Sequence, residues 1–220
     1  FILSLVKEVV ANYDVDGIQG DDRLPAQPIE GGYSEYTDSL YRVEHNGNPP
    51  PQNYRDHEWQ RWRADRLNAF AKQLAHEVRK INPDIIVSWA PSIYPWSYDE
   101  YLQDWPAWIK GGYADLVIPQ VYRYDIKRYR NTLDSLSPDS TGVIPAKDTL
   151  FPGVLMNVGE YVIPTDFLLK SIECNRKKGF QGEVFFFYEG LRKNNDRLAK
   201  ELLNSFYMEK ALLPFKAPQR

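Results

Sequence analysis

The sequence predicts an α/β fold in which short parallel strands alternate with helices. Two observations support this prediction. Apolar runs rich in β-branched and aromatic residues recur along the chain, and stretches with the apolar periodicity of helices separate most of them. The five candidate strands cover residues 15–19, 85–89, 116–121, 151–156 and 184–188.

Helical periodicity is clearest between the first two candidate strands. Apolar residues recur there at three- to five-residue spacing from Trp59 to Ile81, and Asn82-Pro83 then ends the pattern. Similar patterns predict helices at the N-terminus and at residues 168–175 and 198–206, the last of them capped by Asn194 or Asn195. The alternation of strand and helix therefore extends to the C-terminus.

One segment interrupts this alternation. Residues 23–56, which follow the first candidate strand, are rich in Pro, Gly, Asn and Tyr. Because loops of such length are uncommon in compact domains, we expect a functional loop beside the active site, with a disordered excursion as the alternative.

Composition narrows the classes of partner. The 220 residues carry a formal net charge of −3 with Lys and Arg scattered along the chain, so nucleic acid is not expected as a partner. No apolar run approaches the roughly 18 residues that a membrane span needs. Cys174 is the only cysteine, which excludes an internal disulfide. The length fits one domain over residues 1–220.

Acidic residues follow several candidate strands. Asp21 and Asp22 follow the first strand, Asp125 the third and Glu189 the fifth. In parallel α/β barrels the active site lies at the carboxyl ends of the strands, so these carboxylates are expected to converge. Glycoside hydrolysis needs two carboxyl groups that flank the scissile bond. Alternatively, Asp21-Asp22 caps a turn or a helix, which is a common use of aspartate.

Aromatic residues are concentrated beside the same strand ends. All six tryptophans lie between Trp59 and Trp108. Trp59 and Trp62 fall on the apolar stripe of the predicted helix and are expected in the core. Trp89 and Trp96 lie at the end of the second strand and beyond it, and they either line a sugar-binding cleft or pack in the core.

The sequence contains no motif for a metal or a cofactor. His45, His57 and His76 lack the spacing of metal ligands. Gly31-Gly32 lies in the long loop, away from the strand-to-helix turn that phosphate-binding and dinucleotide-binding motifs occupy. We therefore expect neither a metal nor a cofactor.

Four short motifs carry a family resemblance. They are Tyr13-Asp14-Val15-Asp16-Gly17-Ile18 with Asp21-Asp22, Trp62-Arg63 with Asn68, Ser88-Trp89-Ala90-Pro91-Ser92, and Ile118-Pro119-Gln120-Val121-Tyr122. Together they resemble glycosyl-hydrolase-like family 10, over the chain up to about Tyr188. The resemblance implies a (β/α)8 TIM-type barrel of which this chain carries the C-terminal five βα units, strands four to eight, so that the barrel is incomplete.

The resemblance also implies a function. Family members resemble extracytoplasmic barrel hydrolases, and one branch acts on the glycan strands of peptidoglycan. The segment from Asp16 to Asp21 is also similar to a strand motif of the α-amylase superfamily whose closing aspartate is the nucleophile. The implied protein is an extracytoplasmic glycoside hydrolase that acts without a cofactor on a polysaccharide or oligosaccharide, such as a cell-envelope glycan.

These expectations assign roles to particular residues. Asp21 is the candidate nucleophile or base, with Asp22 in support. Either Glu189 or Asp125 is the candidate general acid. Candidate substrate-binding residues, some of them supporting groups, are Arg23, Arg63, Trp89, Trp96, Gln120, Tyr122 and Tyr188.

Other interpretations stay open. A non-catalytic glycan-binding module on the same scaffold is the main alternative, and a purely structural domain is the third. An incomplete barrel would leave open edges beside residues 15–19 and 184–188, where copies of the chain would associate.

Overall fold

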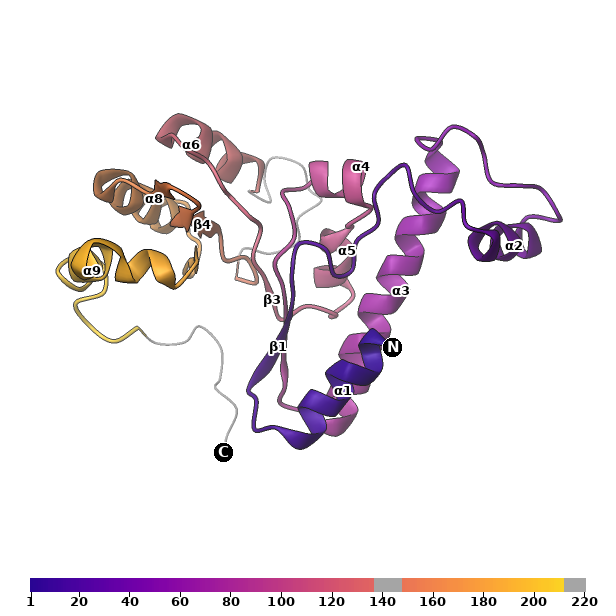
Figure 1. Ribbon diagram of the computed structural model, residues 1–220, viewed down its shortest axis with the longest axis horizontal. Helices are drawn as coiled ribbons and strands as arrows, with labels where there is room; N and C mark the ends of the chain where they lie inside the picture. Colours follow the sequence, from indigo (N-terminus) through magenta and orange to yellow (C-terminus); the bar gives the residue numbers. More distant parts are fainter. Residues whose placement is uncertain (137–147, 212–220) are drawn as a thin grey trace.

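The computed structural model describes residues 1–136 and 148–211 and has a mixed α/β architecture (Figure 1). Its first sheet contains three parallel strands in the order β1 (Gly17–Gly20), β2 (Ile86–Trp89) and β3 (Leu116–Val117). The third strand is shorter than predicted because Pro119 has no N–H to donate to a sheet ladder.

A second parallel pair contains β4 (Gly153–Leu155) and β7 (Val184–Phe186). Two isolated parallel bridges join this pair to the first sheet: Val117 with Leu150, and Gln120 with Gly153. The five predicted strand segments therefore lie side by side, parallel and in chain order. A small antiparallel hairpin of β5 (Asn157–Val158) and β6 (Tyr161–Val162) follows β4 and was not predicted.

The long predicted helix is α3 (His57–Ile81), and it packs beside α1 (Ile2–Asn12) (Figure 1). The carboxylate of Asp56 accepts the N–H of Trp59 at 3.0 Å and so caps the first turn of α3. The helix ends before Asn82-Pro83, because a proline disfavours helical geometry in the residue that precedes it.

The remaining helices pack in sequence along the strands. α5 (Trp105–Lys110) contacts α3, α6 (Ile126–Ser135) packs against α8 (Thr165–Lys177), and α8 contacts α9 (Glu189–Leu203). The strands and helices share one large apolar cluster, which includes Leu74, Val87, Val117, Leu133, Val154 and Leu168. Burial of this surface is the main stabilising contribution to the fold.

The segment that we expected to be one long loop contains a helix. α2 (Glu35–Glu44) lies within residues 23–56, to one side of the first turns of α3 (Figure 1). Ser34 caps it by accepting the N–H of Thr37 at 3.2 Å, and Glu35 and Asp38 favourably occupy its first turn. These capping residues were a sequence signal that the loop prediction overlooked.

The last helix differs in detail from the prediction. Residues 193–196 interrupt α9 with non-helical backbone, and Asn194, Asn195 and Asp196 all have positive φ. Asn and Asp tolerate this left-handed geometry better than most residues. The final helical turns therefore begin after Asp196, slightly later than the cap predicted at Asn194 or Asn195.

Candidate functional site

Three strand ends meet around the ring of Tyr122. Burial raises the pKa of the Tyr122 hydroxyl above its ordinary value, and the negative charges of Asp21 and Asp22, which follow β1, raise it further. The Tyr122 ring also lies 5.5 Å from that of Phe186, at the end of β7. The fold therefore brings the ends of β1, β3 and β7 together, as barrel geometry requires.

The two aspartates have different surroundings. Oδ1 of Asp21 accepts the backbone N–H of Asp22 at 2.8 Å, and the Asp21 side chain is otherwise exposed. Oδ2 of Asp22 instead accepts Nη1 of Arg23 at 2.6 Å. The guanidinium of Arg23 also lies 4.1 Å from the centre of the Tyr101 ring. Arg23 thus compensates the charge of Asp22, whereas the charge of Asp21 faces solvent.

A cavity of about 500 Å³ lies at the ends of β2 and β3. Its lining includes Trp96 at the start of α4 (Trp96–Tyr101), together with Gln120, Tyr122 and Arg123. The Trp96 side chain is 51% exposed, so a ligand can reach its face. Nε2 of Gln120 donates to the carbonyl of Ala90 at 2.9 Å and thereby fixes one cavity wall. A cavity that combines aromatic walls with polar groups is typical of small-ligand sites.

Trp89 does not line this cavity and instead belongs to the core. Its side chain is 1% exposed, its indole N–H donates to the carbonyl of Tyr113 at 3.0 Å, and its ring lies 5.3 Å from that of Trp108. A Cβ atom on Gly20 would lie 2.2 Å from the Trp89 ring, so this position requires glycine. Trp89 therefore packs in the core, and the expectation that it lines a sugar-binding cleft is wrong.

Arg63 is a structural anchor rather than a ligand contact. It is 1% exposed, and its guanidinium donates to the carbonyls of Gly31 and Tyr54 at 2.6 Å and also to that of Ile29. Burial lowers its pKa, and it lies over the Trp59 ring at 4.6 Å. These contacts hold both ends of the long loop on α3 and leave Arg63 remote from solvent.

The candidate acids differ in how they are engaged. Oδ1 of Asp125 accepts the N–H of Arg128 at 2.8 Å, so Asp125 caps α6. Glu189 is exposed in the first turn of α9, three positions after Phe186. The neighbouring Tyr188 is 70% exposed. The geometry thus favours Glu189 over Asp125 as the carboxyl group available to a substrate.

Gln103 contributes to the site and was missed in the sequence. Its buried side-chain amide donates to the carbonyl of Asp22 at 3.0 Å and to that of Pro25 at 3.2 Å. A lone glutamine between two short helices gives no sequence signal for this contact. Arg123, which follows Tyr122 directly, could have been found from its position after the third strand.

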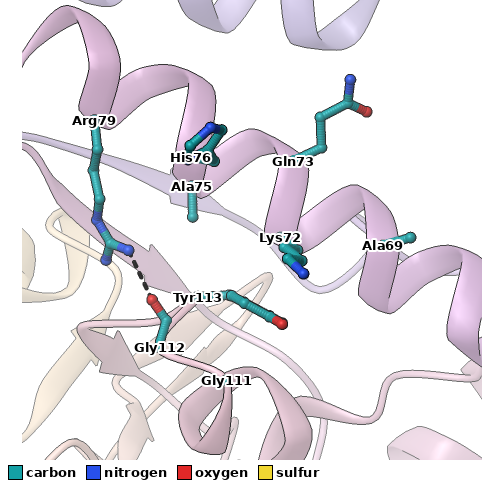
Figure 2. Close-up of a pocket in the computed structure, with 9 residues that line it drawn as sticks. All are labelled: Ala69, Lys72, Gln73, Ala75, His76, Arg79, Gly111, Gly112 and Tyr113. Atoms are coloured by element: carbon teal, nitrogen blue, oxygen red, sulfur yellow. Dashed lines mark hydrogen bonds between the residues drawn. The ribbon is translucent and has the colours of Figure 1, made fainter.

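A second hollow, of about 470 Å³, lies between α3 and the turn that follows α5 (Figure 2). Nη1 of Arg79 donates to the carbonyl of Gly112 at 2.7 Å across it, and the same guanidinium pairs with Asp115 at 3.0 Å. Gly112 and Tyr113 precede β3, so this hollow is at the amino end of that strand, away from the candidate carboxylates.

Within residues 1–136 and 148–211, no group of three His, Cys, Asp or Glu side chains is arranged to hold a metal ion. In the same part of the chain, no helix combines the length and apolar character needed to cross a membrane.

Comparison with solved structures identifies the type of fold. The PgaB (BpsB) glycoside hydrolase domain from Bordetella bronchiseptica superposes with a TM-score of 0.72, at 18% sequence identity. The match covers 91% of this chain and 60% of that one. The chain therefore shares the TIM-barrel-type fold of that domain.

Sequence comparison identifies the family. The chain is 24% identical to glycosyl hydrolase YngK of Bacillus subtilis, over 97% of this chain and 45% of that protein. It is 25% identical to glycosyl hydrolase DigH of Escherichia coli K12, over 73% of this chain and 38% of that protein. It thus spans less than half the length of these relatives. Because the family model of glycosyl hydrolase-like 10 matches residues 1–164, the chain belongs to that family.

Proposed function

We propose that this protein is a glycoside hydrolase that cleaves a polysaccharide or oligosaccharide. Its active site lies at the carboxyl ends of the parallel strands. One observation carries the proposal. Asp21 has no cationic partner among the described residues, and it lies within electrostatic range of Tyr122, which borders an aromatic cavity. Family membership and the names of the relatives support a glycan as the substrate.

The chemistry requires two carboxyl groups with separate roles. Asp21 attacks the anomeric carbon or activates the water that does so, and Glu189 protonates the leaving oxygen. Asp22 keeps Arg23 in place and supports the loop that carries Asp21. Trp96, Tyr122 and Gln120 bind the sugar at the cavity, with Tyr188 beside Glu189.

The substrate and location follow from the family resemblance. We assign the substrate to the cell-envelope glycans, with the glycan strands of peptidoglycan as the leading candidate. Such a substrate lies outside the cytoplasm, so we assign the protein to an extracytoplasmic compartment. Release of reducing ends from purified, peptide-free glycan strands is the direct assay.

The decisive variant is Asp21→Asn in the intact protein. Asparagine keeps the Oδ1 atom that accepts the Asp22 N–H, so folding should persist while turnover falls by about a hundredfold or more. The matched control is Asp84→Asn, because Asp84 is equally exposed but lies just before β2, at the opposite strand end. Retained turnover in Asp21→Asn would reject the assignment.

A non-catalytic glycan-binding module is the second candidate. It is favoured by the engagement of Asp125 as the N-terminal cap of α6, which makes an enzymatic function depend on Glu189 alone as the general acid. A binding module would retain oligosaccharides without releasing products. Its oligosaccharide binding would also be unchanged by Asp21→Asn.

We further propose that residues 1–220 are one domain whose parallel strands are the last five of an eight-stranded barrel. Among the described residues, β1 pairs only with β2, and β7 pairs only with β4. Phe186 of β7 is 42% exposed. Open edges favour association, so this chain alone should elute as a dimer or larger species in light-scattering chromatography. A monodisperse monomer would contradict this part of the proposal.

A further inference from the structure

The cavity at the ends of β2 and β3 carries a positive charge that its own walls do not neutralise. The charge belongs to Arg123, which lines the cavity with the aromatic side chains of Tyr94, Trp96 and Tyr122. Tyr122 also interacts electrostatically with Asp21 and Asp22. The cavity is therefore adjacent to the candidate catalytic carboxylates and separate from them.

The contacts of Arg123 involve only neutral groups. Its Nε donates to Oγ1 of Thr132 at 3.0 Å, and its Nη1 donates to the carbonyl of Tyr122 at 3.0 Å. Within residues 1–136 and 148–211, no carboxylate pairs with it and its Nη2 makes no hydrogen bond. Burial and the positive charge of Arg128 both lower its pKa, which fits a cation without a negative neighbour.

Arg61 and Arg79, which are also partly buried, behave differently, whereas the fully buried Arg63 has carbonyl partners alone in the described part of the chain. Arg61 pairs with Asp104 at 2.7 Å, and Arg79 pairs with Asp115 at 3.0 Å. Partly buried charges are usually paired, because removing a cation from water is costly without a compensating anion. Among the described residues Arg123 has no such anion, although it faces a cavity large enough for a sugar ring.

We propose that this cavity binds a sugar unit that carries an anionic oxygen group, a carboxylate or a sulfate, and that Arg123 is the residue that receives it. Nη2 of the guanidinium donates to the anionic oxygens, in the charge-assisted geometry that arginine favours. Trp96 offers an exposed aromatic face to the same ring. This inference rests on the proposed glycan-cleaving function and names its substrate class as an acidic glycan.

The test uses matched oligosaccharides that differ in one group. Neutral chito-oligosaccharides and cello-oligosaccharides are compared with counterparts oxidised to carboxylates at C6 and with counterparts sulfated at O6. Binding to the intact protein is measured by calorimetry. The wild-type protein should bind at least one anionic form about tenfold or more tightly than its neutral parent. This preference should shrink as salt rises from about 20 mM to 500 mM, because salt screens accessible charges.

Variants then assign the preference to one side chain. Arg123→Gln should bring neutral and anionic forms to within about twofold of each other, and Arg123→Lys should restore part of the difference. The matched control Lys127→Gln removes one positive charge from an exposed position on α6 that does not line the cavity, and it should keep the full preference. Melting temperatures identify any variant that fails to fold. In that case the salt dependence of the wild-type protein's preference for anionic sugars still tests the inference.

The outcomes separate this inference from the function on which it rests. Preference for the carboxylated or the sulfated form identifies which anion is bound, and either supports the inference. Equal binding of neutral and anionic forms by the wild-type protein would overturn the inference and leave the glycan function standing. Loss of the preference in Lys127→Gln as well would overturn it by making the effect one of net charge. Failure to bind any of these sugars, while purified peptide-free glycan strands are still cleaved, would overturn the inference alone, and failure with both kinds of substrate would count against the glycan function and the inference together.

Discussion

The side-chain amide of Gln103 donates to the backbone carbonyl of Asp22 at 3.0 Å, although 81 positions separate the two residues. The same amide nitrogen donates to the carbonyl of Pro25 at 3.2 Å. Gln103 follows α4, so the connection after β2 holds the turn that carries the candidate aspartates after β1. This contact ties the position of the Asp21-Asp22 pair to packing elsewhere in the fold.

Gln103→Met should therefore affect both stability and turnover. Oε1 of Gln103 has no hydrogen-bond partner in the described structure, so the substitution removes only the two donated bonds. Each carbonyl left unpaired costs roughly 1–3 kcal/mol. Displacement of the Asp21 turn should lower turnover by about ten- to hundredfold. Denaturant unfolding and glycan hydrolysis measure the two effects.

The control for this prediction is Gln73→Met. Gln73 is exposed on α3, and its side chain points away from Tyr113 in Figure 2. Its replacement should change stability by less than about 0.5 kcal/mol. If Gln103→Met were as stable and as active as this control, the contact with Asp22 would contribute neither to stability nor to turnover.

Arg63→Met distinguishes a loop anchor from a substrate contact. Since four backbone carbonyls lose a charged donor, the free energy of unfolding should fall by roughly 2 kcal/mol or more. Limited proteolysis should then cut within residues 23–56. Arg66→Met, on the exposed face of the same helix, should cost less than about 1 kcal/mol. Unchanged stability with weakened glycan binding would return Arg63 to the substrate site.

Trp89→Ala and Trp96→Ala should have opposite effects. Trp89 is fully packed, so its truncation should cost about 3–5 kcal/mol. Trp96 is half exposed at the cavity, so its truncation should leave stability nearly unchanged and weaken oligosaccharide binding by about tenfold. Thermal unfolding and calorimetry on both variants provide the comparison. Equal affinity in Trp96→Ala and the wild-type protein would remove Trp96 from the site.

Glu189→Gln and Asp125→Asn decide which carboxyl group is the general acid. Loss of the acid should lower turnover by about a hundredfold or more and remove the basic limb of the pH profile, since the acid must be protonated to act. We expect this result for Glu189→Gln. Asparagine caps helices as well as aspartate does, so Asp125→Asn should preserve both α6 and activity. The reverse pattern would transfer the role to Asp125.

The contact between α1 and α3 should weaken in acid. Hydrogen bonds from Lys7 and then Lys80 lower the pKa of Glu77 from 4.5 to about 2. Because the folded state depresses this pKa, the stabilisation is fully present above about pH 4.5 and is lost as pH falls through about 2. The melting temperatures of the wild-type protein and Glu77→Gln should thus differ at pH 7 and converge near pH 2. A difference that is independent of pH would contradict this account.

The sequence by itself determined the α/β alternation, the positions of the strand segments and the length of α3. These features depend on local signals, namely apolar periodicity and the proline after Asn82, which act whatever the distant contacts are. The sequence also located Asp21, Asp22 and Tyr122 at strand ends. Their proximity then follows from the parallel pairing of strands in chain order.

Only the tertiary structure decided the roles of side chains that the same local pattern left ambiguous. Trp89 and Trp96 lie in one short segment, yet the first is buried against Trp108 and the second lies open at the cavity. The sequence allowed Arg63 to be a substrate ligand, but in the structure its guanidinium donates to carbonyls of a loop more than thirty positions away. Burial and hydrogen-bond partners come from residues distant in sequence, so no local pattern specifies whether a polar or aromatic side chain supports the fold or faces the substrate.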